Sequence, residues 1–166
     1  MKKISNILTP VLFFFLFHVP ASAQVSSNAA MSHADSGHVI LNETDLKWGD
    51  GPPSLPKGAK MAVLQGDPSK EGEFTLRAIL PANYKIAPHW HPTTENITVL
   101  KGNWYLGTGE KFDENKAILI KAGGFASIPA THHHYAFNKD ECIIEVHSMG
   151  PFVINYINPA DDPSKK

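Results

Sequence analysis

Short runs of β-branched and aromatic residues follow one another along most of the chain. They lie at residues 38–41, 59–65, 73–80, 84–90, 95–101, 103–108, 116–121, 125–128, 133–138, 141–148 and 152–157. Glycine, proline, asparagine and aspartate separate them, and no long segment has a convincing helical period, although residues 110–117 suit one helical turn. Strands this short and this regularly spaced predict an all-β sandwich or barrel.

The first residues have the pattern of a secretory signal peptide. Lys2 and Lys3 precede an apolar run centred on residues 11–17. Ala21 and Ala23 then form an A-x-A cleavage site. A membrane anchor needs about 18 or more apolar residues, and this run is shorter. We therefore expect cleavage after Ala23, export to the periplasm or outside of a bacterial cell, and no membrane association afterwards.

The chain that remains after cleavage has the length of one domain. Residues 24–37 are small and polar, which predicts a flexible leader, and residues 158–166 predict a disordered polar tail. A single domain is expected at residues 38–157. The chain has 15 Lys and Arg against 16 Asp and Glu, and loss of the two signal lysines leaves 13 against 16. This balance indicates neither a nucleic acid nor an anionic membrane as partner.

A single cysteine limits how the fold can be stabilised. Cys142 has no second cysteine to pair with, so an internal disulfide is excluded and stability depends on the core, with a bound metal as a further candidate. The residue lies in an apolar run without a flanking cation. This context favours an inert buried thiol over a nucleophile.

The segment PHWHPTTENITVLKG, residues 88–102, places metal-ligand side chains at the start of a predicted strand. His89 and His91 are separated by one residue, so in an extended chain both rings point to the same side. Glu95 shares this parity, and a bend at residues 92–94 lets its carboxylate reach the same centre. Imidazoles and a carboxylate on one side of a strand suit a transition metal.

A second group of histidines lies in residues 123–138. His132, His133 and His134 are adjacent, so they cannot all face the same way. If one of them binds a metal, strand alternation places His134 on the side of Asn138 and His133 on the opposite side.

Together these two segments resemble the paired motifs of the cupin superfamily. The matching residues are His89, His91, Glu95 and Gly102 in the first motif and Gly123, Pro129, His134 and Asn138 in the second. Two positions depart from the pattern, since Asn83 and Thr131 stand where the motifs have glycine. Asparagine tolerates a positive φ better than most residues. Thr131 suggests a differently shaped turn before His134.

The resemblance implies a small single-domain cupin with a double-stranded β-helix, which is a jelly-roll barrel. It also implies that the metal ligands are His89, His91, Glu95 and His134, while Asn138 has a structural role. The expected cofactor is a divalent transition metal, and the donor set does not choose among iron, manganese, nickel, copper and zinc. Four ligands leave two positions open on a six-coordinate ion.

The strand expected at residues 141–148 has two distinct faces. Ile144 and Val146 share one face, and Glu145 and His147 share the other. If the second face lines a cavity, Glu145 and His147 are candidate catalytic residues or hydrogen-bond partners of the ligating histidines. The alternative, that both face solvent, remains open.

The resemblance implies an exported, metal-dependent oxidoreductase of the dioxygenase kind that acts on a small uncharged or aromatic molecule. Arg77 is the only arginine and lies outside both motifs, which disfavours phosphate and dicarboxylate substrates. Two other classes stay open: a non-enzymatic cupin that binds or senses a metal or small ligand, and an isomerase or lyase. A homodimer paired through edge strands is expected.

Overall fold

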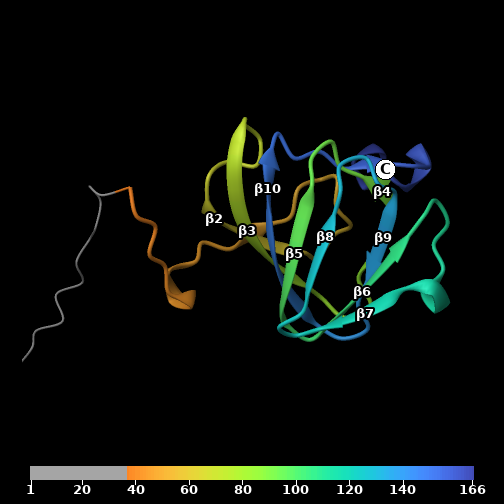
Figure 1. Cartoon of the computed structure of the whole chain (residues 1–166), viewed down its shortest axis with the longest axis horizontal. Helices are drawn as coiled ribbons and strands as arrows, with labels where there is room; N and C mark the ends of the chain where they lie inside the picture. The colour runs from red at the N-terminus through yellow and green to blue at the C-terminus, as the bar shows by residue number, and fades with distance from the viewer. Residues whose placement is uncertain (1–36) are drawn as a thin grey trace, which may run out of the picture. The chain divides into compact units, whose positions relative to one another are not determined.

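Two antiparallel sheets form the barrel that the strand pattern predicts. The structure, a computed structural model, describes residues 37–166, so the expected signal peptide and nearly all of the expected leader lie outside the described residues. The six-stranded sheet has the order β1 (Gly49–Asp50), β2 (Lys60–Gln65), β3 (Gly72–Leu80), β10 (Cys142–Gly150), β5 (Glu95–Lys101) and β8 (Phe125–Ile128) (Figure 1). The five-stranded sheet has the order β11 (Asn155–Tyr156), β4 (Lys85–Trp90), β9 (His134–Phe137), β6 (Asn103–Thr108) and β7 (Ile118–Lys121). The all-β class is confirmed.

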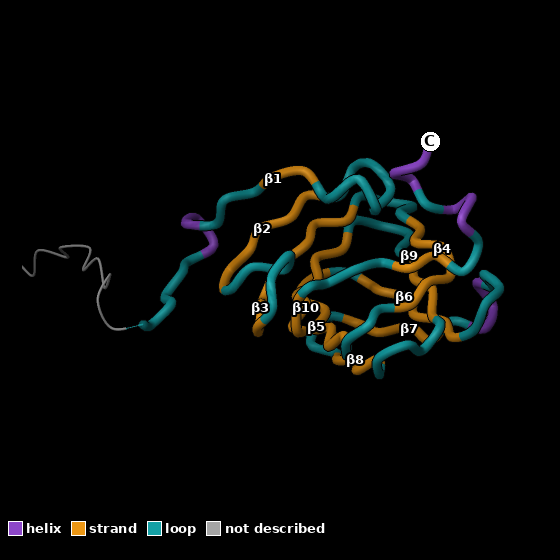
Figure 2. Tube along the Cα trace, turned by 90° about the horizontal axis from the view of Figure 1, so that it is seen from above, coloured by secondary structure: helices purple, strands orange, loops and turns teal. Residues whose placement is uncertain are grey.

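The core lies between the two sheets, which curve around it in the view from above (Figure 2). Strand alternation decides which residues enter it: Ile144 of β10 lies opposite Ala78 of β3, and the buried residues of both strands occupy alternate positions. Cys142 is fully buried in this core, and burial raises the pKa of its thiol to about 11. The buried apolar side chains include Phe74, Leu76, Leu80, Ile97, Val99, Trp104 and Val146.

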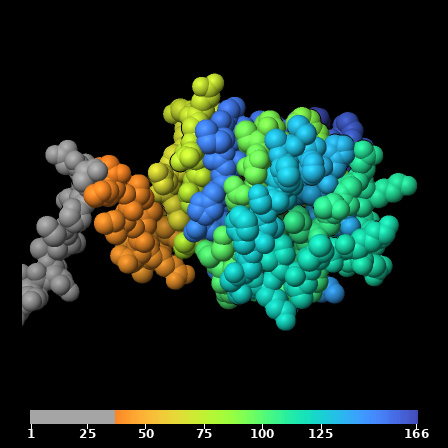
Figure 3. Space-filling view, in the orientation of Figure 1, coloured from red at the N-terminus to blue at the C-terminus, as the bar shows by residue number. Residues whose placement is uncertain are grey.

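Residues 38–41 do not form the strand that their composition suggests. Val39, Ile40 and Leu41 are 53%, 70% and 44% exposed, and the segment has no strand assignment. It belongs to the orange region in Figure 3. The short strand Gly49–Asp50 pairs with β2 instead. Residues 38–41 have a high β-propensity but pair with no neighbouring strand, so their propensity alone does not make them a strand.

Other local structure is helical but short. The helical turn expected at residues 110–117 is the 3₁₀ helix Glu114–Lys116, and a further one spans Glu43–Asp45. Among residues 37–166 no helix is long and apolar enough to cross a membrane.

The C-terminal residues are ordered into two 3₁₀ helices, Pro159–Asp161 and Pro163–Lys165, rather than the disordered tail expected. Asn158 caps the first helix by accepting a hydrogen bond from the Ala160 amide, and Asp162 caps the second in the same way. A capping residue followed by proline is a local helix signal, and it occurs here twice.

A proline-rich segment, residues 51–59, is anchored to the barrel by two tyrosines. The Tyr84 hydroxyl donates to the Pro56 carbonyl at 2.6 Å, and the Tyr156 hydroxyl donates to the Ser54 carbonyl at 2.8 Å. Burial raises the pKa of Tyr156 to about 12. Leu55, between these two anchors, packs against the core.

Asn83 and Thr131 are the two non-glycine residues with positive φ among the described residues, at 61° and 65°. The Asn83 amide donates to the Lys139 carbonyl, and the Thr131 amide donates to the His91 carbonyl at 2.8 Å. Both therefore adopt the left-handed conformation that glycine favours. The prediction of a differently shaped turn at Thr131 is wrong. Thr131 adopts the left-handed conformation that glycine would adopt, at the steric cost that this conformation has for a residue with a side chain.

Replacing Thr131 with glycine should raise the free energy of unfolding by ~0.5–1 kcal/mol. The left-handed conformation costs an L-residue ~1–2 kcal/mol, and glycine removes this cost. Glycine also gives the unfolded chain more conformational freedom, which offsets part of the gain. Urea denaturation followed by tryptophan fluorescence measures this. Thr98→Gly, in the extended strand β5, is the matched control and should lower stability. Equal destabilisation by both changes would contradict strain at Thr131.

Candidate metal centre

Three histidines meet in the interior of the barrel. His89 of β4 lies directly opposite His134 of β9 in the sheet register, and His91 follows immediately after β4. Each offers a ring nitrogen, and these nitrogens all lie within 4.8 Å of one another. The three residues are only 2–4% exposed. Of the groups of histidine, cysteine and acidic residues in the described chain, this is the one with the spacing of a metal site.

A shift in strand register brings His89 inward. Ile86 and His89 are separated by an odd number of positions, yet both line the interior. The pairing of β4 with β9 is irregular between these two residues, as in a β-bulge, and this resets the alternation. From His89 onward the alternation is regular, so His91 also faces inward.

Glu95 reaches the histidines from the opposite sheet. It is the first residue of β5, and its Oε2 lies 3.3 Å from His134 Nε2 and 3.6 Å from His91 Nε2. Its side chain is buried. The structure therefore brings all four predicted ligands together, three from one side of the barrel and one from the other.

Main-chain carbonyls orient the three imidazoles. The Nδ1 atoms of His89, His91 and His134 lie 2.7, 2.8 and 3.0 Å from the carbonyl oxygens of Ala87, Val153 and His132. A carbonyl oxygen can only accept, so each Nδ1 carries the proton and donates. Each Nε2 keeps its lone pair free for a metal.

The charges of these side chains suit a divalent cation. Burial, followed by the neighbouring His134 and His91, lowers the pKa of His89 to about 3, and burial also lowers the pKa of His91. Burial alone raises the pKa of Glu95, but the nearby His134, His91 and His89 outweigh this effect and lower the pKa. An ionised Glu95 beside the neutral imidazoles of His89 and His91 gives the site a negative charge, which suits a cation.

One atom of the cluster lacks a partner, and this tests whether a metal fits. His91 Nε2 is buried and makes no hydrogen bond. Leaving such an atom unsatisfied costs about 1–3 kcal/mol. A metal ion at the centre of the four side chains would satisfy it, and imidazole and carboxylate donors suit iron, manganese, nickel, copper or zinc alike. The residues present therefore fit a divalent transition metal.

The space beside the histidines is small and apolar. A cavity of about 60 Å³ touches His89, His91 and Glu95, and its other walls are Leu55, Met61, Leu76, Ala78, Leu80, Ile86, Ile144, Val146, Phe152 and Ile154. A second cavity of about 40 Å³ touches His89, Glu95 and His134 and is closed by Trp104 and aliphatic side chains. Apart from the four predicted ligands, no charged side chain lines either space.

A family described as "Domain of unknown function (DUF4437)" matches residues 15–155, most of the chain. The chain belongs to this family. No curated protein sequence matches it.

Solved structures show that this DUF4437 member has the fold of the cupins, which the two motifs resemble. The polyketide cyclase RemF from Streptomyces resistomycificus has a TM-score of 0.63 and 18% identity, covering 76% of this chain and 89% of that one. A candidate acetylacetone dioxygenase from Methylibium petroleiphilum PM1 has a TM-score of 0.59 and 17% identity, covering 80% and 90%. An RmlC-like cupin from Shewanella frigidimarina NCIMB 400 has a TM-score of 0.53 and 13% identity, covering 69% and 91%. The double-stranded β-helix is confirmed.

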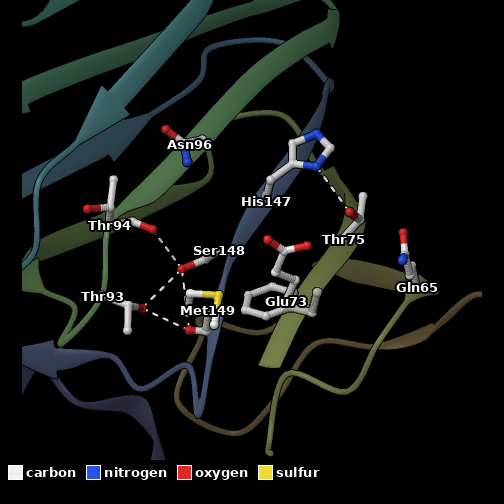
Figure 4. A pocket seen from close by; sticks show the side chains of 10 residues that line it. Gln65, Glu73, Thr75, Thr93, Thr94, Asn96, His147, Ser148 and Met149 are labelled. Atoms are coloured by element: carbon white, nitrogen blue, oxygen red, sulfur yellow. Dashed lines mark hydrogen bonds between the residues drawn. The ribbon is translucent and has the colours of Figure 1, made fainter. Parts of the chain in front are cut away.

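Glu145 and His147 lie on the outer face of the six-stranded sheet. The His147 ring contacts Thr75 of β3 at 3.0 Å through Nδ1 (Figure 4). Its Nε2 lies 3.2 Å from Glu145 Oε1. Glu145 also accepts two hydrogen bonds from Arg77. The inner face of β10 is occupied by Ile144 and Val146, so Glu145 and His147 do not face the histidine cluster. His147 instead lines a separate pocket with Thr75, Thr93 and Asn96, and the catalytic role of Glu145 and His147 stays a prediction. Main-chain carbonyls, rather than these two side chains, support the ligating histidines.

The other motif residues lie as their alternation indicates. His133 faces away from His134 and pairs with Glu110 at 3.1 Å. Asn138 is buried, and its amide nitrogen donates to the carbonyls of Pro81 and Asp140, which is a structural role.

Two contributors to the site have no motif in the sequence. The Val153 carbonyl holds His91, and the Phe152 ring stacks on the His91 ring with centroids 4.2 Å apart and planes 13° apart. A carbonyl is present at every residue, so its role depends on tertiary structure. The only sequence feature that could have indicated the role of Phe152 was the presence of an aromatic residue in the run at residues 152–157.

Replacing His89 with alanine should reduce bound metal from about one ion per chain to near zero, because the change removes one of the converging donors. Elemental analysis after reconstitution with iron, manganese, nickel, copper or zinc measures it. His147→Ala is the matched control, since this histidine lies on the outer face, and it should retain full metal content. Loss of metal in both variants, or in neither, would contradict the site.

Proposed function

We propose that this cupin is a metal-dependent oxidoreductase of the dioxygenase kind that acts on a small uncharged organic molecule. The observation that carries the proposal is the convergence of three buried imidazoles and one carboxylate beside a small apolar cavity. Four such donors leave two positions of a six-coordinate ion for ligands. The metal would supply Lewis-acid or redox chemistry at these positions.

The chain's own residues supply orientation and water exclusion. The carbonyls of Ala87, His132 and Val153 fix the imidazoles, and the apolar walls limit the entry of water. No lysine or arginine lines the two cavities next to the histidines, so a phosphate or carboxylate group would have no cationic partner there. This favours a neutral ligand bound through its own metal-binding atoms.

The similar structures support both this proposal and one alternative. The candidate acetylacetone dioxygenase favours oxygen chemistry on a small organic molecule, whereas the polyketide cyclase favours a lyase- or isomerase-type reaction that needs no oxygen. One fold hosts many chemistries, so neither likeness decides between them. The small cavity volume is also what a binding or sensor cupin would have.

We further propose that the mature protein works in the periplasm or outside the cell as a homodimer. The signal-peptide pattern supports export. Exposed apolar side chains on residues 38–41 and at a sheet edge, such as Ile118 of β7, support association with a second copy.

The iron-loaded protein should consume oxygen when given a panel of uncharged diketones and phenols, because the open metal positions can hold both reactants. His134→Ala should reduce turnover on the order of 100-fold or more, since a ligand is lost. An oxygen electrode measures consumption, and product analysis under argon separates the two mechanisms. Equal product formation without oxygen would refute the dioxygenase and favour a lyase or isomerase.

Light scattering of the mature protein at micromolar concentration should give twice the mass of one chain. Ile40→Ser, which places a hydroxyl in the exposed apolar segment, should shift the mass toward one chain if this segment forms the contact. A single-chain mass for the unmodified protein would contradict the homodimer.

A further inference from the structure

Phe152 forms part of the wall of the cavity at the metal centre. Its ring stacks on His91, and it contacts Phe74 with centroids 5.2 Å apart and planes at 60°. Phe74 is fully buried, while Phe152 is only partly buried. Phe152 therefore has protein on its inner side and access to solvent, whereas Phe74 belongs to the fixed core.

The main chain around Phe152 is held in place. The Phe152 amide donates to the Pro68 carbonyl at 2.7 Å, and the Val153 carbonyl accepts from His91 Nδ1 at 2.8 Å. Further along, the Ile157 amide donates to the Pro88 carbonyl at 2.9 Å. A movement of the backbone would break a bond to a predicted metal ligand, but a rotation of the Phe152 side chain breaks no hydrogen bond.

The rest of the cavity wall is less able to move. Most of its side chains project from β2, β3, β4 and β10, which are paired within the sheets. Leu55 comes from the proline-rich segment, which Tyr84 and Tyr156 anchor through hydrogen bonds. Phe152 is the one phenyl ring in the cavity wall, and its rotation costs only its contacts with His91, Phe74 and the cavity.

The volume of the cavity limits what fits while Phe152 is in place. A water molecule in the liquid occupies about 30 Å³, and an apolar cavity of about 150 Å³ holds benzene. The cavity of about 60 Å³ is well below the volume that holds benzene. Removal of the phenyl ring would add space comparable to a benzene molecule.

We propose that Phe152 is the gate of the metal centre and the residue that sets the size of its ligands. With the ring stacked on His91, the centre admits neutral molecules of about two or three non-hydrogen atoms, the size class of dioxygen. Larger neutral molecules enter only when the ring turns out of the cavity. This inference rests on the proposed metal centre and does not depend on the reaction that it performs.

The test uses the full mature chain loaded with iron(II) and two uncharged probes. Nitric oxide has two atoms, and its binding to the iron is read by electron paramagnetic resonance. Imidazole is a five-membered ring, and its binding is read as suppression of the nitric oxide signal. The wild-type protein should give the nitric oxide signal with little effect of imidazole. Phe152→Ala should give the same nitric oxide signal in the absence of imidazole. The imidazole concentration that halves this signal should be at least ~10-fold lower in Phe152→Ala than in the wild-type protein, since a steric barrier is removed.

Two further variants make the result specific. Phe125→Ala carries the same substitution at an exposed position of β8 and should behave as wild type. Phe152→Leu keeps an apolar side chain of intermediate size and should give an intermediate response, which also serves if the alanine variant folds poorly. Iron content should be unchanged in all three variants, because the Val153 carbonyl that holds His91 belongs to the main chain.

Each outcome decides the proposal. Equal suppression by imidazole in wild type and Phe152→Ala, or no suppression in either, would overturn the gate while leaving the metal centre intact. Absence of bound iron and of the nitric oxide signal in the wild-type protein would overturn the metal centre and the gate with it. Enhanced imidazole binding in Phe152→Ala alone supports the gate.

Discussion

The functional centre depends on the hydrogen bonds between three imidazoles and three main-chain carbonyls. Each buried Nδ1 would cost about 1–3 kcal/mol if it lacked a partner, so the carbonyls of Ala87, His132 and Val153 make the cluster tolerable inside the barrel. They also fix the tautomer, which turns every Nε2 toward the same point. The main chain itself therefore positions the imidazoles for metal binding before any metal is bound.

This arrangement concentrates polar groups in an otherwise apolar interior. Glu95 shares the space with His91 and His134, while Ile86, Ile144 and Val146 surround them. Burial penalises charge and lowers the pKa of His89 and His91, which favours their neutral form, while the pKa of Glu95 is lowered by the neighbouring histidines against the effect of its own burial. The low polarity of the walls strengthens the attraction between this carboxylate and a cation at the centre.

The sequence predicted the side chains of the site far better than the parts that support them. The spacing of His89, His91 and Glu95 follows from strand alternation, which acts locally and is visible in the residues. The register shift before His89 and the carbonyl of Val153 arise from pairing between distant segments, and they have no residue signature. The same alternation separated Glu145 and His147 from Ile144 and Val146, but it could not tell which face was inside. The apolar character of the second pair was the better guide.

Residues 151–154 contribute both to holding a predicted metal ligand and to limiting the size of the cavity. Through Val153 the segment holds a predicted metal ligand by its main chain, and through Phe152 it limits the cavity by a side chain. Metal retention and ligand size are therefore set by different atoms of the same segment. A substitution at residue 152 can change the accepted ligand without loosening His91, whereas a change in the path of the backbone would affect both. Selectivity in this barrel can thus vary while the metal centre stays the same.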